Sequence, residues 1–217
     1  MKRRIVVAAI LAVLLAVSAG AQTTDFLDLA KSGTPQSVQA AINQGENVNA
    51  QDENAMTALM FAARYNQNPE VINTLIEAGS DLNGRDMYGM TALMLAAEYN
   101  QNPKMILTLL KAGSDLNARD MYGMTVLMAA AIGNPNTDAI TTLLKAGSDL
   151  NARDTTDMTP LMYAVANPNP VVIITLLTAG ADAKAKDNKK QTAFDRARGN
   201  AKLKGTDAYR RLNEAQY

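Results

Sequence analysis

Methionine dominates the residues of this chain that could do chemistry. There are 12 methionines, but neither histidine nor cysteine. The group Met87, Met90 and Met94 returns with the same spacing 34 residues later. Thioether sulfur is a soft ligand that suits Cu(I). Binding of Cu(I) by exposed methionines is therefore one candidate function, although the histidine and cysteine that commonly complete such sites are missing.

Aspartates recur with the same regularity, but the sequence offers no catalytic constellation around them. Each stands alone in its segment, where its carboxylate is expected to accept hydrogen bonds from nearby backbone N–H groups of a turn. Without histidine the usual base for neutral pH is absent, and no phosphate-binding loop, serine-hydrolase motif or dinucleotide motif occurs. The sequence predicts a protein that is not an enzyme and uses no cofactor. The recurring aspartates are Asp52, Asp86, Asp120, Asp154 and Asp187.

A repeat of 34 residues organises the chain. Residues 90–94 read Met-Thr-Ala-Leu-Met, and close copies stand at 56–60, 124–128 and 158–162. A fixed period of this size is typical of stacked supersecondary units that bury a continuous core between neighbours. It favours an extended binding surface over a single catalytic pocket.

Each repeat carries the start and stop signals of two short helices. Thr91 precedes an apolar stretch, where its hydroxyl can cap a helix. Asn102-Pro103 is a cap residue followed by proline at the first helical position. Gly113 then ends the second helix, because glycine accepts the left-handed conformation. These signals recur at Thr57, Thr125, Thr159 and Thr192, at Asn68-Pro69 and Asn169-Pro170, and at Gly45, Gly79, Gly147 and Gly180.

Two segments carry a family resemblance. Residues 86–97 read D-M-Y-G-M-T-A-L-M-L-A-A, and residues 109–120 read L-L-K-A-G-S-D-L-N-A-R-D. Both resemble the ankyrin repeat. The resemblance implies an all-α ankyrin-repeat solenoid of about six helix-turn-helix units with short β-turn fingers. The expected divisions are a signal peptide at 1–21, an N-terminal capping repeat at 22–49, four full repeats at 50–184 and a C-terminal capping repeat at 185–217.

The chain departs from the family pattern at the position of its usual histidine, which normally makes hydrogen bonds between neighbouring units. Methionine stands there instead, so we expect thioether packing to replace those bonds. These methionines are predicted to be buried in the core: Met60, Met94, Met128 and Met162. With Met94 inside and Met87 and Met90 outside, the three methionines would not converge on one metal ion.

The resemblance also implies where a partner protein would bind, namely the concave face formed by the fingers and the first helix of each unit. Tyrosine and arginine recur at binding hot spots, and methionine offers an adaptable apolar surface. We therefore predict non-catalytic binding of another protein by a monomer. The predicted partner-binding residues are Met56, Tyr65, Arg85, Met87, Tyr88, Met90, Tyr99, Arg119, Met121, Tyr122, Met124, Arg153 and Met158. The simpler alternative is that these residues repeat only because one unit was duplicated.

A basic C-terminal unit offers a second binding alternative. It carries ten lysines and arginines between Lys184 and Arg211, which either solvate a terminal cap or meet an acidic partner. Over the whole chain, 21 basic residues balance 21 acidic ones. That balance lacks the basic excess of a nucleic-acid-binding protein.

The first residues read as an export signal. Lys2, Arg3 and Arg4 precede an apolar run over residues 5–17, and Ala19-Gly20-Ala21 fits a cleavage site. Cleavage would leave 18 basic against 21 acidic residues, a net charge of −3. We expect a periplasmic or secreted protein with no membrane contact after cleavage. Retention of the segment as an anchor is the alternative, although the run is shorter than the ~20 residues of a membrane span.

Overall fold

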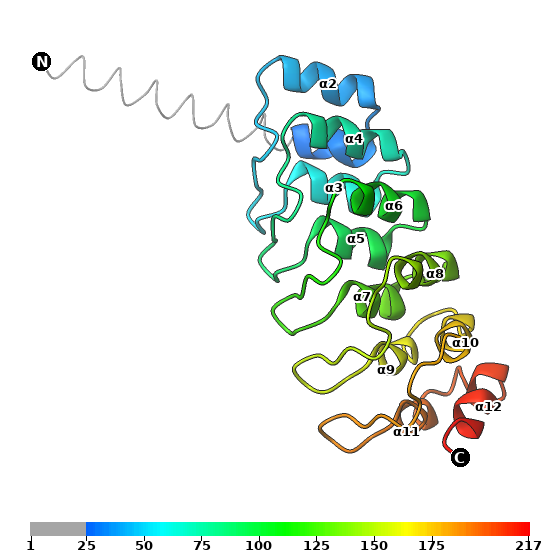
Figure 1. Cartoon of the computed structure of the whole chain (residues 1–217). Helices are drawn as coiled ribbons and strands as arrows, with labels where there is room; N and C mark the ends of the chain where they lie inside the picture. Colours follow the sequence, from blue (N-terminus) through cyan, green and yellow to red (C-terminus); the bar gives the residue numbers. More distant parts are fainter. Residues whose placement is uncertain (1–24) are drawn as a thin grey trace, which may run out of the picture.

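The computed structural model describes residues 25–217. The predicted signal peptide, its cleavage site and the alternative membrane anchor all lie outside the described residues. Within them the chain is an all-α solenoid of stacked helix pairs, which confirms the predicted fold class (Figure 1). No helix of this part of the chain is long and apolar enough to cross a membrane.

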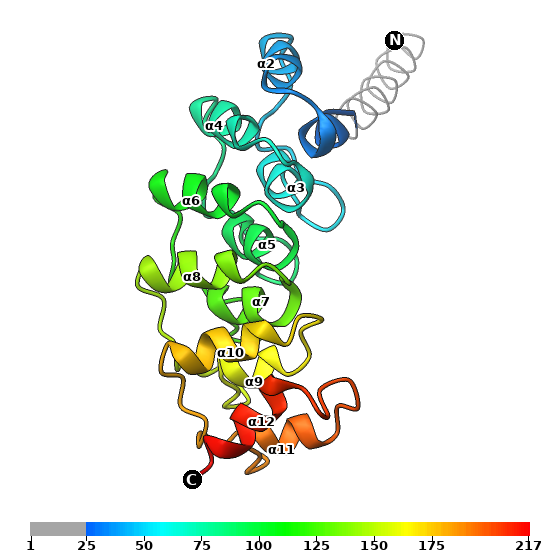
Figure 2. The same ribbon diagram turned by 90° about the vertical axis from the view of Figure 1, so that its right-hand side faces the viewer.

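The helices form two parallel columns. Residues 25–32 are helical and begin the inner column, which continues with α3 (Ala58–Tyr65), α5 (Ala92–Tyr99), α7 (Val126–Gly133), α9 (Pro160–Ala164) and α11 (Ala193–Arg198). The outer column holds α2 (Pro35–Asn43), α4 (Pro69–Glu77), α6 (Pro103–Lys111), α8 (Thr137–Lys145), α10 (Val171–Thr178) and α12 (Asp207–Glu214). Long loops, the fingers, project from the side of the inner column (Figures 1 and 2).

The helix boundaries follow the predicted signals. Thr91 caps α5 by accepting a hydrogen bond from the N–H of Met94, and Asn102 caps α6 by accepting one from Lys104. After α6 the chain turns at Gly113 with φ +99°, a conformation that costs a residue without Cβ very little. The same arrangement recurs in the neighbouring units, so local chemistry repeats every helix pair.

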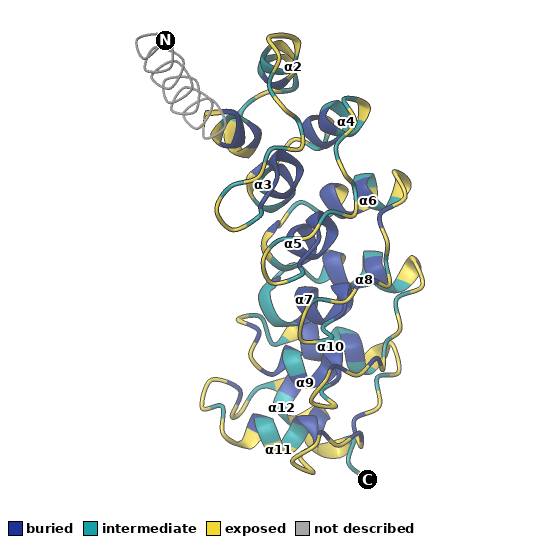
Figure 3. Ribbon diagram, turned by 90° about the vertical axis from the view of Figure 1, so that its left-hand side faces the viewer, coloured by how far each residue is buried: buried dark blue, intermediate teal, exposed yellow. Residues whose placement is uncertain are grey.

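The core lies between the two columns and runs along the whole stack (Figure 3). Paired alanines such as Ala96 and Ala97 are fully buried and let successive inner helices pack closely, α3 on α5 and α5 on α7. The prediction that the methionines at the histidine position are core residues is confirmed, since none of Met60, Met94, Met128 and Met162 is more than 2% exposed.

Bonds between units come from buried asparagines that the sequence analysis did not single out. Nδ2 of Asn100 donates to the carbonyl oxygens of Ala63 and Asn66 in the preceding unit, at 2.9 and 2.7 Å. Its Oδ1 accepts a hydrogen bond from the N–H of Asn102. Asn66, Asn134 and Asn167 make the same pair of backward bonds, and Asn200 makes one of them. This asparagine ladder supplies buried hydrogen bonds between neighbouring units, whereas the methionines at the histidine position contribute packing in the core.

Candidate functional site

Each finger is closed by its aspartate, as predicted. Oδ1 of Asp86 accepts hydrogen bonds from the backbone N–H groups of Tyr88 and Met90, at 2.9 and 2.8 Å. Successive fingers are joined by backbone bonds, for example from the N–H of Met121 to the carbonyl of Tyr88 at 3.0 Å. The fingers are therefore held at a fixed spacing, and their side chains form a continuous surface.

A groove of about 480 Å³ lies between three of these fingers and the inner helices α3, α5 and α7. Tyr88 and Tyr122, each about half exposed, stand on the finger side of it. Tyr99 and Glu98 belong to the helix side. We call this site the finger groove. Its lining residues are Asn54, Met56, Arg64, Asp86, Tyr88, Met90, Leu95, Glu98, Tyr99, Asp120, Tyr122, Met124 and Ile132.

The methionines before the threonines are less exposed than expected. Met56 and Met90 are only 8% and 9% exposed, so the expectation that Met90 points outward is wrong. Their backbones complete the finger turns: the carbonyl of Met90 accepts from the N–H of Asp86, and its own N–H donates to the Asp86 carboxylate. The closed turn brings the side chain beneath the finger, where it lines the groove instead of projecting into solvent.

An arginine on α3 stacks on the aromatic side of the groove. The guanidinium carbon of Arg64 lies 4.0 Å from the ring centroid of Tyr99 and 5.0 Å from that of Tyr65. Its Nε is buried and has no hydrogen-bond partner among the described residues. A cation this close to an aromatic face is held by the ring quadrupole. Arg64 was not among the predicted partner-binding residues, although its neighbour Tyr65 was.

Acidic groups outnumber this arginine. Glu98, Asp86 and Asp120 all line the groove. Burial raises the pKa of Glu98, and this effect exceeds the lowering by the Tyr99 hydroxyl and by Arg64. Burial and the neighbouring Glu98 raise the pKa of Tyr99 to about 12, so its hydroxyl stays protonated at neutral pH. The groove thus offers carboxylates, phenol hydroxyls and aromatic faces above a methionine floor.

The comparison with family models decides the identity of this repeat. Models of ankyrin repeats in three copies match residues 26–120 and 119–187. The chain belongs to the ankyrin repeat family. A comparison with curated proteins gives no match. Ankyrin repeats are generally protein–protein interaction modules, and the family is typically non-catalytic.

Three predicted binding residues connect neighbouring ankyrin fingers instead of lining the groove. Nη1 of Arg119 donates to the carbonyls of Gly123 and Arg153, both at 2.7 Å. Arg85 and Arg153 make the equivalent bonds within their own finger and to the next one. Their charge pairing with a partner remains a prediction, but each guanidinium already has a structural role in the stack.

The remaining predicted residues are dispersed. Met87 and Met121 stand at the finger tips and are more than half exposed, outside the groove lining. Tyr65, on α3, packs beside Phe61, and its ring centroid lies 5.1 Å from Nζ of Lys31. The groove therefore gathers six of the predicted residues, which are Met56, Tyr88, Met90, Tyr99, Tyr122 and Met124.

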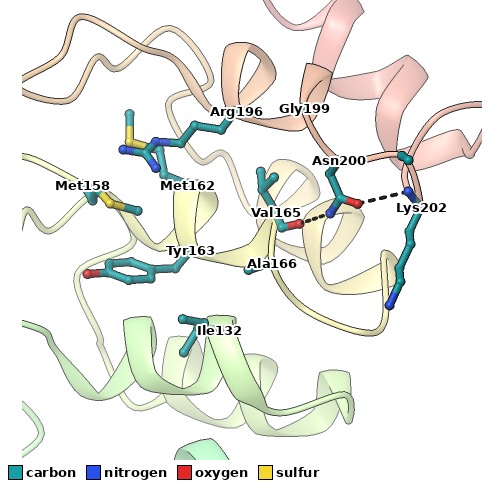
Figure 4. A pocket seen from close by; sticks show the side chains of 11 residues that line it. Ile132, Met158, Met162, Tyr163, Val165, Ala166, Arg196, Gly199, Asn200 and Lys202 are labelled. Carbon is teal, nitrogen blue, oxygen red and sulfur yellow. Dashed lines mark hydrogen bonds between the residues drawn. The ribbon is translucent and has the colours of Figure 1, made fainter.

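Met158 lines a second, more open cavity of about 640 Å³ between the last ankyrin units (Figure 4). Its tyrosine hydroxyl and its arginine guanidinium already have partners within the protein. The Tyr163 hydroxyl donates to Asp154 at 2.6 Å, and the Arg196 guanidinium donates to Asp187. A ligand in this cavity would compete with those bonds, so the cavity is a weaker candidate site.

The three methionines of one unit on which the copper alternative was based do not share a surface. Met94 is fully buried and Met90 nearly so, whereas Met87 is exposed at its finger tip. Residues 25–217 contain no group of three His, Cys, Asp or Glu side chains placed to hold a metal ion. The thioethers of one unit are thus distributed between the core, the groove floor and solvent.

The basic C-terminal unit is partly neutralised by its own acids, since four of its ten basic side chains form ion pairs. Arg210 pairs with Asp207 and Glu214, and Arg211 pairs with Asp207. Nζ of Lys184 donates to the carbonyl of Tyr217 at 3.0 Å. Paired charges of this kind attract an acidic partner less than the residue count alone indicates.

Proposed function

We propose that this protein binds another protein through its finger side, without catalysis, in the periplasm or outside the cell. Tyr88 and Tyr122 carry the proposal: two half-exposed tyrosines, on fingers held in register, flank a groove of about 480 Å³. Tyrosine combines a large rigid contact area with a hydroxyl and is common at binding hot spots. The repeated side chains at the groove mouth supply the anchors, and Met56 and Met90 supply its apolar floor.

The location rests on the first residues of the sequence, namely a basic start, an apolar run over residues 5–17 and a small-residue cleavage motif. We test it by fusing alkaline phosphatase, which is active only after export, to the C-terminus of the full chain. High phosphatase activity that disappears when residues 5–17 are interrupted by two arginines supports export. Equal activity from both fusions, or none from either, contradicts it.

Site-specific crosslinking tests the binding face. A photoreactive phenylalanine analogue replaces Tyr122 in one protein and Leu107, an exposed residue of the outer helix α6, in the other. Both are irradiated in a native extract of the source organism, and crosslinked proteins are identified by mass spectrometry. We expect one partner to be crosslinked from position 122 and not from 107. A partner crosslinked from 107 alone would refute binding through the finger side.

A double variant then tests the energy of the contact. Tyr88→Ser with Tyr122→Ser removes both exposed anchors but leaves the buried Met56 and Met90 in the core. We expect loss of partner capture with unchanged helicity. High salt separates this site from the basic C-terminal unit. Binding through exposed basic residues should weaken strongly at high ionic strength, whereas binding anchored by Tyr88 and Tyr122 should weaken less.

A further inference from the structure

The ionic groups of the finger groove are unbalanced. It is lined by three acidic residues, Asp86, Glu98 and Asp120, but by one cation, Arg64. Asp86 and Asp120 each use Oδ1 to close a finger turn. No ion pair within residues 25–217 involves any of these three acids. Burial of Glu98 without an ion-pair partner disfavours its charged form. A ligand that brought a positive charge beside it would restore the balance.

The aromatic groups of the groove favour the same kind of ligand. Tyr88, Tyr99 and Tyr122 line it from both sides, and aromatic faces attract cations. The groove already holds one such contact, in which Arg64 lies 4.0 Å from the centroid of Tyr99. An anionic ligand would have Arg64 as its only counter-ion and would be repelled by three carboxylates.

The long apolar stem of a basic side chain also fits the floor. Lysine and arginine bury their methylene groups against apolar surface while the charged end keeps polar partners. Met56, Met90 and Met124 provide that surface beneath the tyrosines. The acids lie on both sides, with Asp86 and Asp120 on the fingers and Glu98 on α5.

We propose that the finger groove recognises an arginine or lysine side chain of an extended segment of the partner protein, with Glu98 as its principal counter-ion and Tyr88, Tyr99 and Tyr122 around it. This proposal deepens the function given above and rests on it. The fingers select a protein partner, and the groove selects a basic residue within that partner.

Blocked pentapeptides with a central arginine flanked by glycines test the proposal on protein purified from cells that express the full chain. The matched probe carries citrulline, which has the shape of arginine without its charge. Methionine methyl NMR reads out occupancy, since the methyl groups of Met56, Met90 and Met124 report on the groove and that of Met105, buried in the outer column, serves as internal reference. We expect the arginine peptide to shift the three groove methyls and the citrulline peptide to leave them unchanged.

Glu98→Gln is the decisive variant, because it removes the charge and keeps the size of the side chain. It should lower the affinity for the arginine peptide by about tenfold or more, as expected for loss of a partly buried counter-ion. Glu77→Gln removes the same charge from the exposed end of α4 and should change the affinity by less than about twofold. Equal binding of both peptides, equal effects of the two variants, or no methyl shift up to about 10 mM peptide would each overturn the proposal.

Failure of this proposal differs from failure of the proposed function. If the Tyr88→Ser, Tyr122→Ser variant loses its partner while Glu98→Gln and excess arginine peptide leave capture unchanged, the fingers bind a partner whose basic residues are not recognised. If neither variant affects capture, the binding face itself is misplaced.

Discussion

Gly133 faces Glu98 at a distance that leaves no room for a side chain. A Cβ atom at position 133 would lie 2.5 Å from Cγ of Glu98 and 2.9 Å from its carbonyl oxygen. The same repeat position carries Tyr65 and Tyr99 in the two preceding units. The break in the tyrosine pattern thus creates the space that the Glu98 side chain fills beside the finger groove.

Gly133→Ala should therefore disturb both packing and binding. The new methyl group must displace Glu98 and part of the α5 backbone, and overpacking of this kind costs about 1–3 kcal/mol. We expect the midpoint of urea unfolding to fall by a corresponding amount and the arginine peptide to bind more weakly. Gly84→Ala is the control, because a Cβ there meets only ordinary contacts at 3.4–3.5 Å. Equal losses for the two variants would argue against the Glu98 contact.

Glu98→Gln, unlike Gly133→Ala, should increase the stability of the protein at neutral pH. The pKa of Glu98 is raised in the folded protein by burial, so the stability that this group contributes is present below its unfolded pKa, about 4.3, and is lost as the pH rises through the folded value. The neutral glutamine avoids that loss. We expect the variant to be more stable than the wild type at pH 7 and equal to it near pH 3.5. Urea unfolding at both pH values measures the difference, and a variant less stable at pH 7 would refute the assignment.

Asn100→Ala should be among the most destabilising polar substitutions in the chain. It removes two donors to carbonyls of the preceding unit and one acceptor within the turn, at a residue that is 1% exposed. Buried groups left without partners cost about 1–3 kcal/mol each, so we expect a loss of at least 3 kcal/mol in urea unfolding. Asn49→Ala also removes a donor and an acceptor between units, but at an exposed site, and should cost about 1 kcal/mol. Similar losses of unfolding free energy in the two variants would show that burial does not determine how much the asparagine hydrogen bonds stabilise the protein.

Acid should destabilise the C-terminal unit through Asp187. Burial alone would raise the pKa of this carboxyl, but the backbone N–H of Gln191 and the Arg196 guanidinium bind it and hold the pKa below its ordinary value. Stability from such a group is present above the unfolded pKa of about 3.9 and is lost as the pH falls toward the lower folded value. Asp187→Asn should unfold more easily than the wild type at pH 7. Its stability should also fall less steeply than that of the wild type between pH 4 and 2. Circular dichroism measures both effects. Asp149→Asn, at an exposed carboxylate, should keep the wild-type profile.

Much of the fold was predictable because its signals are local. Thr91 and Asn102 cap helices with their own neighbours, and Gly113 ends α6 with its own φ angle. Such features depend only on residue types at short spacing, so a repeat of 34 residues displays them several times. The family resemblance then supplied the arrangement of the helix pairs.

The asparagine ladder was missed for a physical reason. The partners of Asn100 are backbone carbonyls 34 and 37 residues away, and every residue has a carbonyl, so no sequence pattern marks the acceptor. The donors themselves were visible as asparagines 34 residues apart at Asn66, Asn100 and Asn134.

The site was harder to predict, because its distinguishing residues do not repeat. Arg64 and Glu98 share a repeat position that is Ile132 in the next unit, and Gly133 stands where the two preceding units carry tyrosine. Met90, in contrast, repeats and lies mostly beneath its finger. The residues that repeat in this chain are mainly those needed to stack one unit on the next. The side chains that make the groove unlike other surfaces are found where the repetition stops.

Every unit of the ladder carries both its donor and its acceptors, and this has a consequence for how the chain can change over evolutionary time. A 34-residue segment copied in tandem, from Thr91 to Met124 for example, would find acceptors for its asparagine in the unit before it and offer its own carbonyls to the unit after it. The array of repeats can therefore gain or lose whole units without needing a new kind of interface between neighbouring units. Such a lineage can lengthen or shorten its recognition surface by recombination within one gene, while single substitutions at positions such as 64, 98 and 133 decide what that surface distinguishes.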